Sequence, residues 1–155
     1  MCIRDSQVAA KAALIAWCLR SGQPVVVAGG AGGRTDPTRM RRADLAAVRG
    51  DPLLAGVRRL LRRDHGFPAA DGPRPVAFGV PAVYSEESAR PPPATDAAAP
   101  HRGAALACAG YGSSVVVTAP LGFAVAARAI ETLLGDRTRL AGAGATIVGM
   151  TVAEG

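Results

Sequence analysis

The feature that most constrains the fold is a run of valines that ends in a cluster of glycines, "VVVAGGAGG" at residues 25–33. A short, fully apolar run of this kind is typical of a strand buried on both faces of a parallel sheet. The preceding residues 7–22 are rich in Ala and Leu, which predicts a helix with Gly22 at its C-terminal cap. Because a helix followed by a buried strand is half of a βαβ unit, the expected fold class is α/β, with helices on both faces of the sheet.

The clearest helix follows at residues 51–66, "DPLLAGVRRLLRRDHG". Asp51 is a candidate N-cap, Pro52 takes the first helical position and Gly66 follows the end. Apolar residues recur with helical spacing and predict one buried face; they are Leu53, Leu54, Val57, Leu60 and Leu61. The arginines fall on the other side.

The remaining segments give weaker signals. "RMRRADLA" at 39–46 is either a polar edge strand or the lead-in to a helix. Residues 75–87 predict a strand, which Pro81 should confine to an edge or a bulge. Residues 88–102 are proline-rich and predict a surface loop, and 113–134 predict a helix that Pro120 either kinks or begins. Residues 135–155 form a weakly specified tail, in which "ATIVGMTV" could add a strand.

Residues 103–127 contain no charged side chain and are long enough to cross a bilayer. They also contain four glycines and Pro120. We therefore expect a glycine loop and a buried helix rather than a membrane span, although membrane association stays open as an alternative.

Charge and cysteine content limit the possible partners. The net charge of +6 allows an anionic partner such as nucleic acid, a nucleotide or a membrane surface, but it also fits an ordinary basic surface. The cysteines Cys2, Cys18 and Cys108 are far apart, so neither a disulfide framework nor a metal site is indicated. A reduced, cytoplasmic setting fits best.

The glycine run does not match the common phosphate-binding motifs. A GxxxxGK[ST] loop fails because Ala28 stands five positions before Gly33. A GxGxxG turn that starts at Gly30 fails because Thr35 replaces the third glycine. The run still lies at the carboxyl end of a strand, where ligands approach open α/β sheets, so its glycines serve either close approach to a ligand or a positive-φ turn.

Three segments carry a resemblance to a known family: "GGAGG-x-x-DPT" with the following "DLA" and "DPL", then "VPAVYSEE", then "CAGYGSSVVVTAPLGFAVAARAI". Together they resemble the C-terminal half of tRNA threonylcarbamoyladenosine dehydratases, in the ubiquitin-activating-enzyme-like superfamily. The likeness covers residues 7–134. Residues 1–6, "MCIRDS", do not match, so we expect the homology to start at Gln7.

The resemblance implies the C-terminal part of a Rossmann-like nucleotide-activating fold, a mixed sheet with flanking helices. It also implies ATP and Mg²⁺ as cofactors, tRNA as substrate, a homodimer and a possible sulfur-transfer partner protein. The family adenylates a carboxylate of threonylcarbamoyladenosine, and the activated acyl group then cyclises with net loss of water. Most of the family's nucleotide-binding residues lie upstream of this stretch, so we expect this chain alone to be inactive.

The resemblance places Gly29, Gly30, Gly32 and Gly33 near the adenylate. Asp36 and Thr38 either orient that loop or contact substrate, or they form a local Asx-turn. The helix arginines are candidates for tRNA phosphates or for a solvated face: Arg58, Arg59, Arg62 and Arg63.

Other chemically reactive side chains are less favoured. Cys108 matches a family cysteine and is a candidate for a covalent role, although a bystander thiol is preferred. Cys18 is expected in the core, and His65 is expected to interact with a helix dipole. Glu86 and Glu87 are candidates for positioning a substrate amine, although a place on the surface is preferred.

Two alternatives to the dehydratase remain. A related enzyme that adenylates a ubiquitin-like sulfur carrier is disfavoured, because such enzymes often carry two CxxC pairs and this chain has none. The other alternative is not an enzyme: a non-catalytic basic module that binds RNA or associates with membranes.

Overall fold

The computed structural model describes residues 3–70, 75–90 and 112–145. The main elements, in chain order, are α1 (Ile3–Arg20), β1 (Val27–Ala28), β2 (Met40–Asp44), α2 (Pro52–His65), β3 (Pro81–Ser85) and α3 (Val115–Ala145). Two 3₁₀ helices flank β2, namely η1 (Pro37–Arg39) and η2 (Leu45–Ala47).

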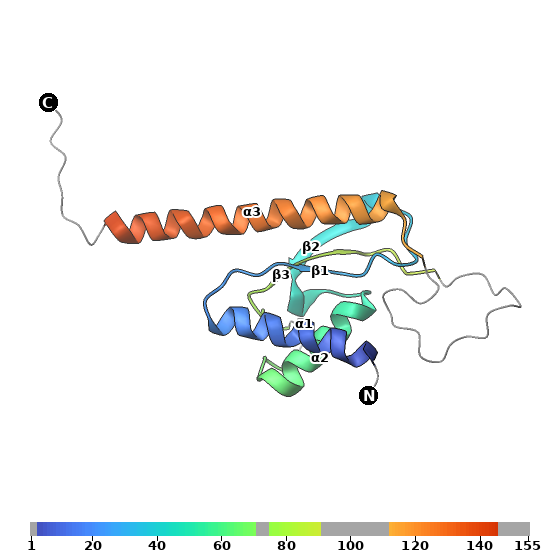
Figure 1. Cartoon of the computed structure of the whole chain (residues 1–155), viewed down its shortest axis with the longest axis horizontal. Coiled ribbons are helices and arrows are strands. Elements are labelled where there is room, and N and C mark those ends of the chain that lie inside the picture. The colour runs from blue at the N-terminus through green and yellow to red at the C-terminus, as the bar shows by residue number, and fades with distance from the viewer. Residues whose placement is uncertain (1–2, 71–74, 91–111, 146–155) are drawn as a thin grey trace, which may run out of the picture.

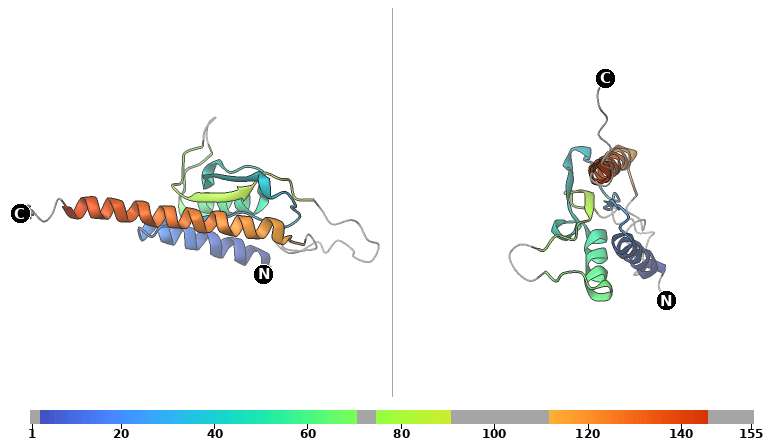
Figure 2. Two further views of the ribbon diagram at one scale, coloured as in Figure 1. Left: turned by 90° about the horizontal axis from the view of Figure 1, so that it is seen from above. Right: turned by 90° about the vertical axis from the view of Figure 1, so that its left-hand side faces the viewer.

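The elements form three layers. The sheet lies in the middle, α1 and α2 pack together on one face, and α3 crosses the other face (Figures 1 and 2). The expected α/β class with flanking helices is therefore confirmed.

The sheet is mixed, with the order β1-β3-β2. β1 pairs with β3 in parallel through Val27 and Ala82, and β2 pairs with β3 antiparallel through Arg42 and Val83. β2 is therefore an edge strand, which confirms the first of the two alternatives for residues 39–46. β1 is only two residues long, shorter than its valine run predicts.

The prediction that Pro81 confines its strand to an edge or a bulge is wrong, because β3 is the central strand. Pro81 is the first residue of β3 and pairs with Asp44. A proline at the first residue of a strand is tolerated, because its missing N–H leaves the hydrogen bonds of the following strand residues intact. Those residues, Ala82 to Ser85, are all buried.

The ends of α1 and α2 follow their sequence signals. After α1, Gly22 has a φ of 65°, and the Gln23 N–H donates to the carbonyl of Cys18. α2 begins at Pro52 behind the N-cap Asp51, and Gly66 ends it in the left-handed conformation. Both predicted helices are therefore confirmed.

The core lies between α1, α2 and the sheet. Ile15 of α1, Leu54 and Leu61 of α2, and Val80 before β3 are at most 2% exposed. The predicted apolar face of α2 is confirmed except for Leu53, which is half-buried.

α3 departs from expectation in two ways. It is not a buried helix, because Phe123 is 75% and Ile130 57% exposed, whereas Val117 and Leu121 are buried. It also continues to Ala145, so residues 135–145 extend the helix instead of belonging to a weakly specified tail. Pro120 lies inside it and does not mark its start.

Candidate functional site

The glycine loop at 29–33 lies beside the segment that follows β3, because β1 and β3 run parallel and end at the same edge. The Gly29 N–H donates to the Val83 carbonyl at 2.8 Å, and the Arg90 N–H donates to the Gly33 carbonyl at 2.8 Å. This is the carboxyl edge of the sheet, where ligands approach folds of this type.

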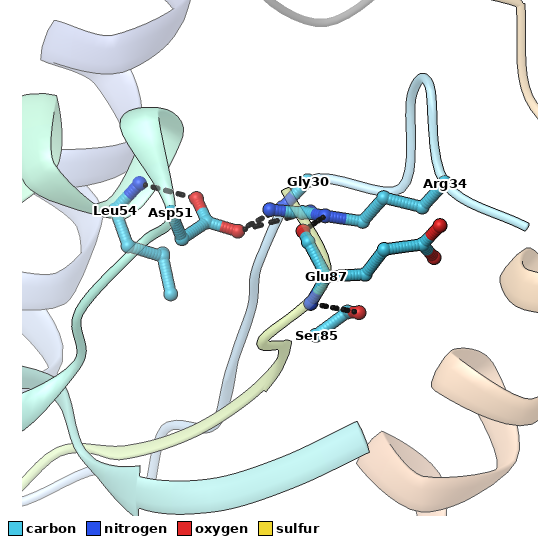
Figure 3. A network of polar contacts seen from close by, with 6 residues as sticks. All are labelled: Gly30, Arg34, Asp51, Leu54, Ser85 and Glu87. Atoms are coloured by element: carbon cyan, nitrogen blue, oxygen red, sulfur yellow. Dashed lines mark hydrogen bonds and ion pairs between the residues drawn. The ribbon is translucent and has the colours of Figure 1, made fainter. Parts of the chain in front are cut away.

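Asp51 connects this loop to the start of α2 (Figure 3). One carboxylate oxygen accepts from the Leu54 N–H at 2.9 Å and caps the helix. The other accepts from the Gly30 N–H at 2.9 Å and from the Arg34 guanidinium at 3.2 Å. One fully buried side chain therefore fixes both the helix and the loop.

Arg34 is only 2% exposed and bridges the two segments. Its Nη1 pairs with Asp51, and its Nε donates to the Glu87 carbonyl at 2.8 Å. Its Nη2 is buried and has no hydrogen-bond partner among the described residues. A buried guanidinium depends strongly on its counter-ion, so this pair should hold the loop in one position.

Glu87 fixes the far end of the loop. Its carboxylate accepts from the backbone N–H groups of Thr35, at 2.9 Å, and Asp36, at 2.8 Å, and from the Thr35 hydroxyl at 3.2 Å. The Asp36 N–H, followed by the bonds from Thr35, lowers the pKa of Glu87. The expectation that Glu87 lies on the surface is wrong, whereas Glu86 is exposed and pairs with Arg41.

The glycines of the loop have separate structural reasons. A Cβ on Gly29 would stand 2.5 Å from a carboxylate oxygen of Asp51 and 2.9 Å from the Cβ of Tyr84. Gly33 has a φ of 70°, which favours glycine. Gly30 and Gly32 line a cavity of about 60 Å³ together with Arg34 and Asp51. Tight packing and turn geometry thus explain Gly29 and Gly33 without a ligand.

Asp36 and Thr38 form the local turn that was one of their two expected roles. The Asp36 carboxylate accepts from the Thr38 N–H at 2.8 Å and from its hydroxyl at 2.6 Å. These two bonds lower the pKa of Asp36. Asp36 is the N-cap of η1.

The four arginines of α2 differ in their surroundings. Arg59 and Arg63 are exposed, and Arg63 pairs with Asp64. Arg62 stacks 5.2 Å from the ring centre of Phe78. Arg58 is half-buried, and burial, followed by repulsion from Arg62, lowers its pKa. The face is therefore not uniformly solvated.

Among the thiols, Cys18 is buried on α1, as expected. Cys108 lies outside the described residues, as do Cys2 and His101. His65 is the last residue of α2, where its interaction with the helix end was expected. No group of three His, Cys, Asp or Glu residues gathers to hold a metal within residues 3–70, 75–90 and 112–145.

The glycine-loop residues alone do not fit a nucleotide. Their cavity of about 60 Å³ is far below the roughly 300 Å³ or more of small-molecule sites. Two larger hollows, of about 360 and 510 Å³, lie beside α3 and are lined by Arg128 rather than by the glycine loop.

The sequence reasoning missed Arg34, the buried role of Glu87 and the second role of Asp51. A usable signal existed for Glu87, because it follows a strand at the edge where the glycine loop lies. Nothing in the local sequence links Arg34 to Asp51, since the contact spans 17 residues.

The mixed sheet with flanking helices matches part of a Rossmann-like, ThiF-type fold, as the solved structure of TcdA shows with a TM-score of 0.65. No family model matches the chain. The tRNA threonylcarbamoyladenosine dehydratase of Haemophilus influenzae is 41% identical over 128 residues, which are 82% of this chain and 47% of that protein. The Escherichia coli enzyme is 35% identical over 135 residues, 83% of this chain and 49% of that protein.

Solved structures agree. The E. coli enzyme TcdA in complex with AMP matches with a TM-score of 0.65 and 35% identity, over 83% of this chain and 46% of that one. The same enzyme with ATP matches with a TM-score of 0.61 over 83% and 45%. The resemblance to the tRNA threonylcarbamoyladenosine dehydratases is thus confirmed, and the chain spans about half the length of the relatives it matches.

Proposed function

We propose that this chain is part of an ATP-dependent enzyme that adenylates and cyclises threonylcarbamoyladenosine in tRNA. The observation that carries the proposal is the combination of 41% and 35% identity to two dehydratases with a shared fold. The structures of the E. coli relative in complex with AMP and with ATP support nucleotide use. ATP supplies the activation, because a carboxylate becomes an electrophile once AMP is its leaving group.

In this proposal the chain's own residues shape one wall of the adenylate site. Asp51 and Arg34 hold the loop at Gly30, and Glu87 holds it at Thr35 and Asp36. Fixed in this way, the loop can bring bare backbone close to the acyl-adenylate without reorganising. The nucleotide phosphates and Mg²⁺ are assigned to residues that this stretch lacks.

The proposal also covers partners and setting. Arg59 and Arg63 are exposed on α2 and offer charge to tRNA phosphates, whereas Arg58 and Arg62 are half-buried and contribute less. We place the protein in the cytoplasm, as a homodimer, with a sulfur-transfer protein as a further candidate partner. Cys108 stays a candidate for a covalent role.

A chimera tests the function. The matched half of the E. coli relative is replaced by this chain, and tRNA nucleosides are analysed by mass spectrometry after reaction with ATP. We expect the cyclic, dehydrated nucleoside from the chimera. A chimera that folds and binds ATP but forms no product would refute the proposal.

Arg59 and Arg63 are then tested by substitution to Gln in that chimera. We expect weaker tRNA binding with an unchanged affinity for ATP. Equal tRNA binding would leave the basic residues of α2 as a solvated face.

A further inference from the structure

Arg34 has one hydrogen-bond donor that its known contacts do not use. Its Nε donates to the Glu87 carbonyl and its Nη1 pairs with Asp51, but its buried Nη2 has no hydrogen-bond partner among the described residues. The guanidinium stays protonated, so Nη2 always presents two N–H groups. A buried donor without an acceptor keeps the full cost of its lost hydration, and an incoming oxygen atom removes that cost.

The cavity of about 60 Å³ lies beside this guanidinium. Arg34 and Asp51, both 2% exposed, line its inner side and meet at Gly30 (Figure 3). A Cβ on Gly30, another lining residue, would stand 3.5 Å from Nη1, so the guanidinium end of Arg34 faces this space rather than its aliphatic stem. Pro52 and Ala89 also line the cavity and are exposed, which leaves a side open to a ligand from solvent.

The surrounding charges decide which kind of acceptor fits. Asp51 balances the positive charge of Arg34, and Glu87, whose carbonyl binds Nε, adds a second carboxylate nearby. An anion such as phosphate or acetate would thus enter beside two acids and one base, and would be repelled. A cation would offer Nη2 no acceptor. A neutral carbonyl oxygen accepts the hydrogen bond without adding charge.

The size of the cavity limits this carbonyl to a small group. About 60 Å³ holds roughly four water-sized atoms, because each needs about 10–15 Å³ of such space. An amide or ureido unit has that size, and the apolar Pro52, Leu53 and Ala89 suit the carbon atoms attached to it. The threonylcarbamoyl group of the proposed substrate contains such a ureido carbonyl.

We propose that the cavity between the glycine loop and the start of α2 binds the ureido carbonyl of the substrate, with Nη2 of Arg34 as the donor. This inference rests on the proposed function for the identity of the substrate, and it goes further by giving Arg34 a contact with the group that reacts. The contacts of Arg34 with Asp51 and Glu87 then hold the guanidinium in place, so that Nη2 needs no reorganisation when the carbonyl arrives.

The test uses three small probes of similar size on the full chain labelled with nitrogen-15. N-methylurea presents the neutral carbonyl, N-methylguanidinium replaces its oxygen with a donor, and acetate carries a negative charge. Two-dimensional NMR follows the backbone N–H signals of Gly30 and Gly32, which line the cavity. We expect saturable shifts with N-methylurea, with a Kd on the order of 10 mM. Binding of acetate should be at least fivefold weaker, and N-methylguanidinium should cause no saturable shift.

Arg34→Lys then tests the donor itself. Lysine keeps the positive charge opposite Asp51 but lacks the planar second amino group, so we expect at least fivefold weaker binding of N-methylurea. Arg20→Lys is the matched control, because it makes the same change at an exposed arginine at the end of α1. It should bind N-methylurea as wild type does.

Three results would overturn the proposal. They are the absence of a saturable shift with N-methylurea, which would mean that Nη2 meets only water, equal binding of N-methylguanidinium, and unchanged binding in a folded Arg34→Lys variant. The comparison of probes on wild type decides the question even where that variant does not fold. A chimera that forms the cyclic nucleoside while the chain ignores N-methylurea would refute this inference alone. Binding of N-methylurea together with an inactive chimera would refute only the proposed function.

Discussion

At the residue scale, Gly29 has the least freedom to change. Gly29→Ala would place a methyl group against Asp51 and Tyr84, and we expect a loss of about 1–3 kcal/mol in the free energy of unfolding, measured with urea. Gly56→Ala is the control, since its Cβ would meet only Val8 at 3.4 Å in the middle of α2. That change should stabilise the chain by about 0.5–1 kcal/mol. Equal effects at both positions would contradict the packing argument.

The Arg34–Asp51 pair gives a second residue-scale prediction. Asp51→Asn keeps a good helix cap but leaves the Arg34 guanidinium buried without its counter-ion. We expect a loss of about 3 kcal/mol or more, partly recovered in the double variant with Arg34→Met. The matched control Asp36→Asn removes the charge of a half-buried turn acid that lies outside the ion pair, and it should change the free energy of unfolding by less than about 0.5 kcal/mol. A double variant no better than Asp51→Asn would disprove the coupling.

Glu87 predicts a pH dependence. Its pKa is lowered in the folded chain, so the stability it contributes is complete above its ordinary pKa of 4.5 and is lost as the pH falls through the lowered value. Urea unfolding of wild type and Glu87→Gln is compared at several pH values. The stability advantage of wild type should shrink on acidification from pH 5. A difference that does not vary with pH would show that Glu87 does not hold the loop as a carboxylate.

At the scale of elements, the sequence predicted the helices whose start and end signals are local. Asp51, Pro52 and Gly66 bound α2 as the capping rules require. The place of β3 was not predictable, because a proline at a strand's first residue and one at an edge look identical in sequence. The contacts that hold the glycine loop were missed for a similar reason, because Arg34 and Glu87 meet only after β1 and β3 pair.

Pro120 makes a prediction for α3. It is the sixth residue of the helix, so its missing N–H removes a bond from the helix interior. Pro120→Ala should raise the thermal midpoint of the helical signal in circular dichroism. A lower midpoint would indicate that the proline fits a bend that the sheet requires.

At the scale of the whole molecule, the chain should not bind ATP tightly by itself. The loop cavity of about 60 Å³ cannot enclose a nucleotide, and the relatives have about twice the matched length. Isothermal titration of the chain with ATP should give no micromolar binding, whereas the chimera should bind. Micromolar binding to the isolated chain would mean that the chain forms a nucleotide site by itself, against this prediction.

The strand order has a consequence for synthesis on the ribosome. β1 lies next to β3, although η1, β2, η2 and α2 come between them in the chain. Val27 therefore waits for Ala82 to emerge before it can pair. Until then α1 and α2 can form, but the valine segment has no neighbour, and such long-range pairing is slow. We expect the nascent chain to be exposed to misassociation during this interval, in which a chaperone that shields short apolar segments would be of most use.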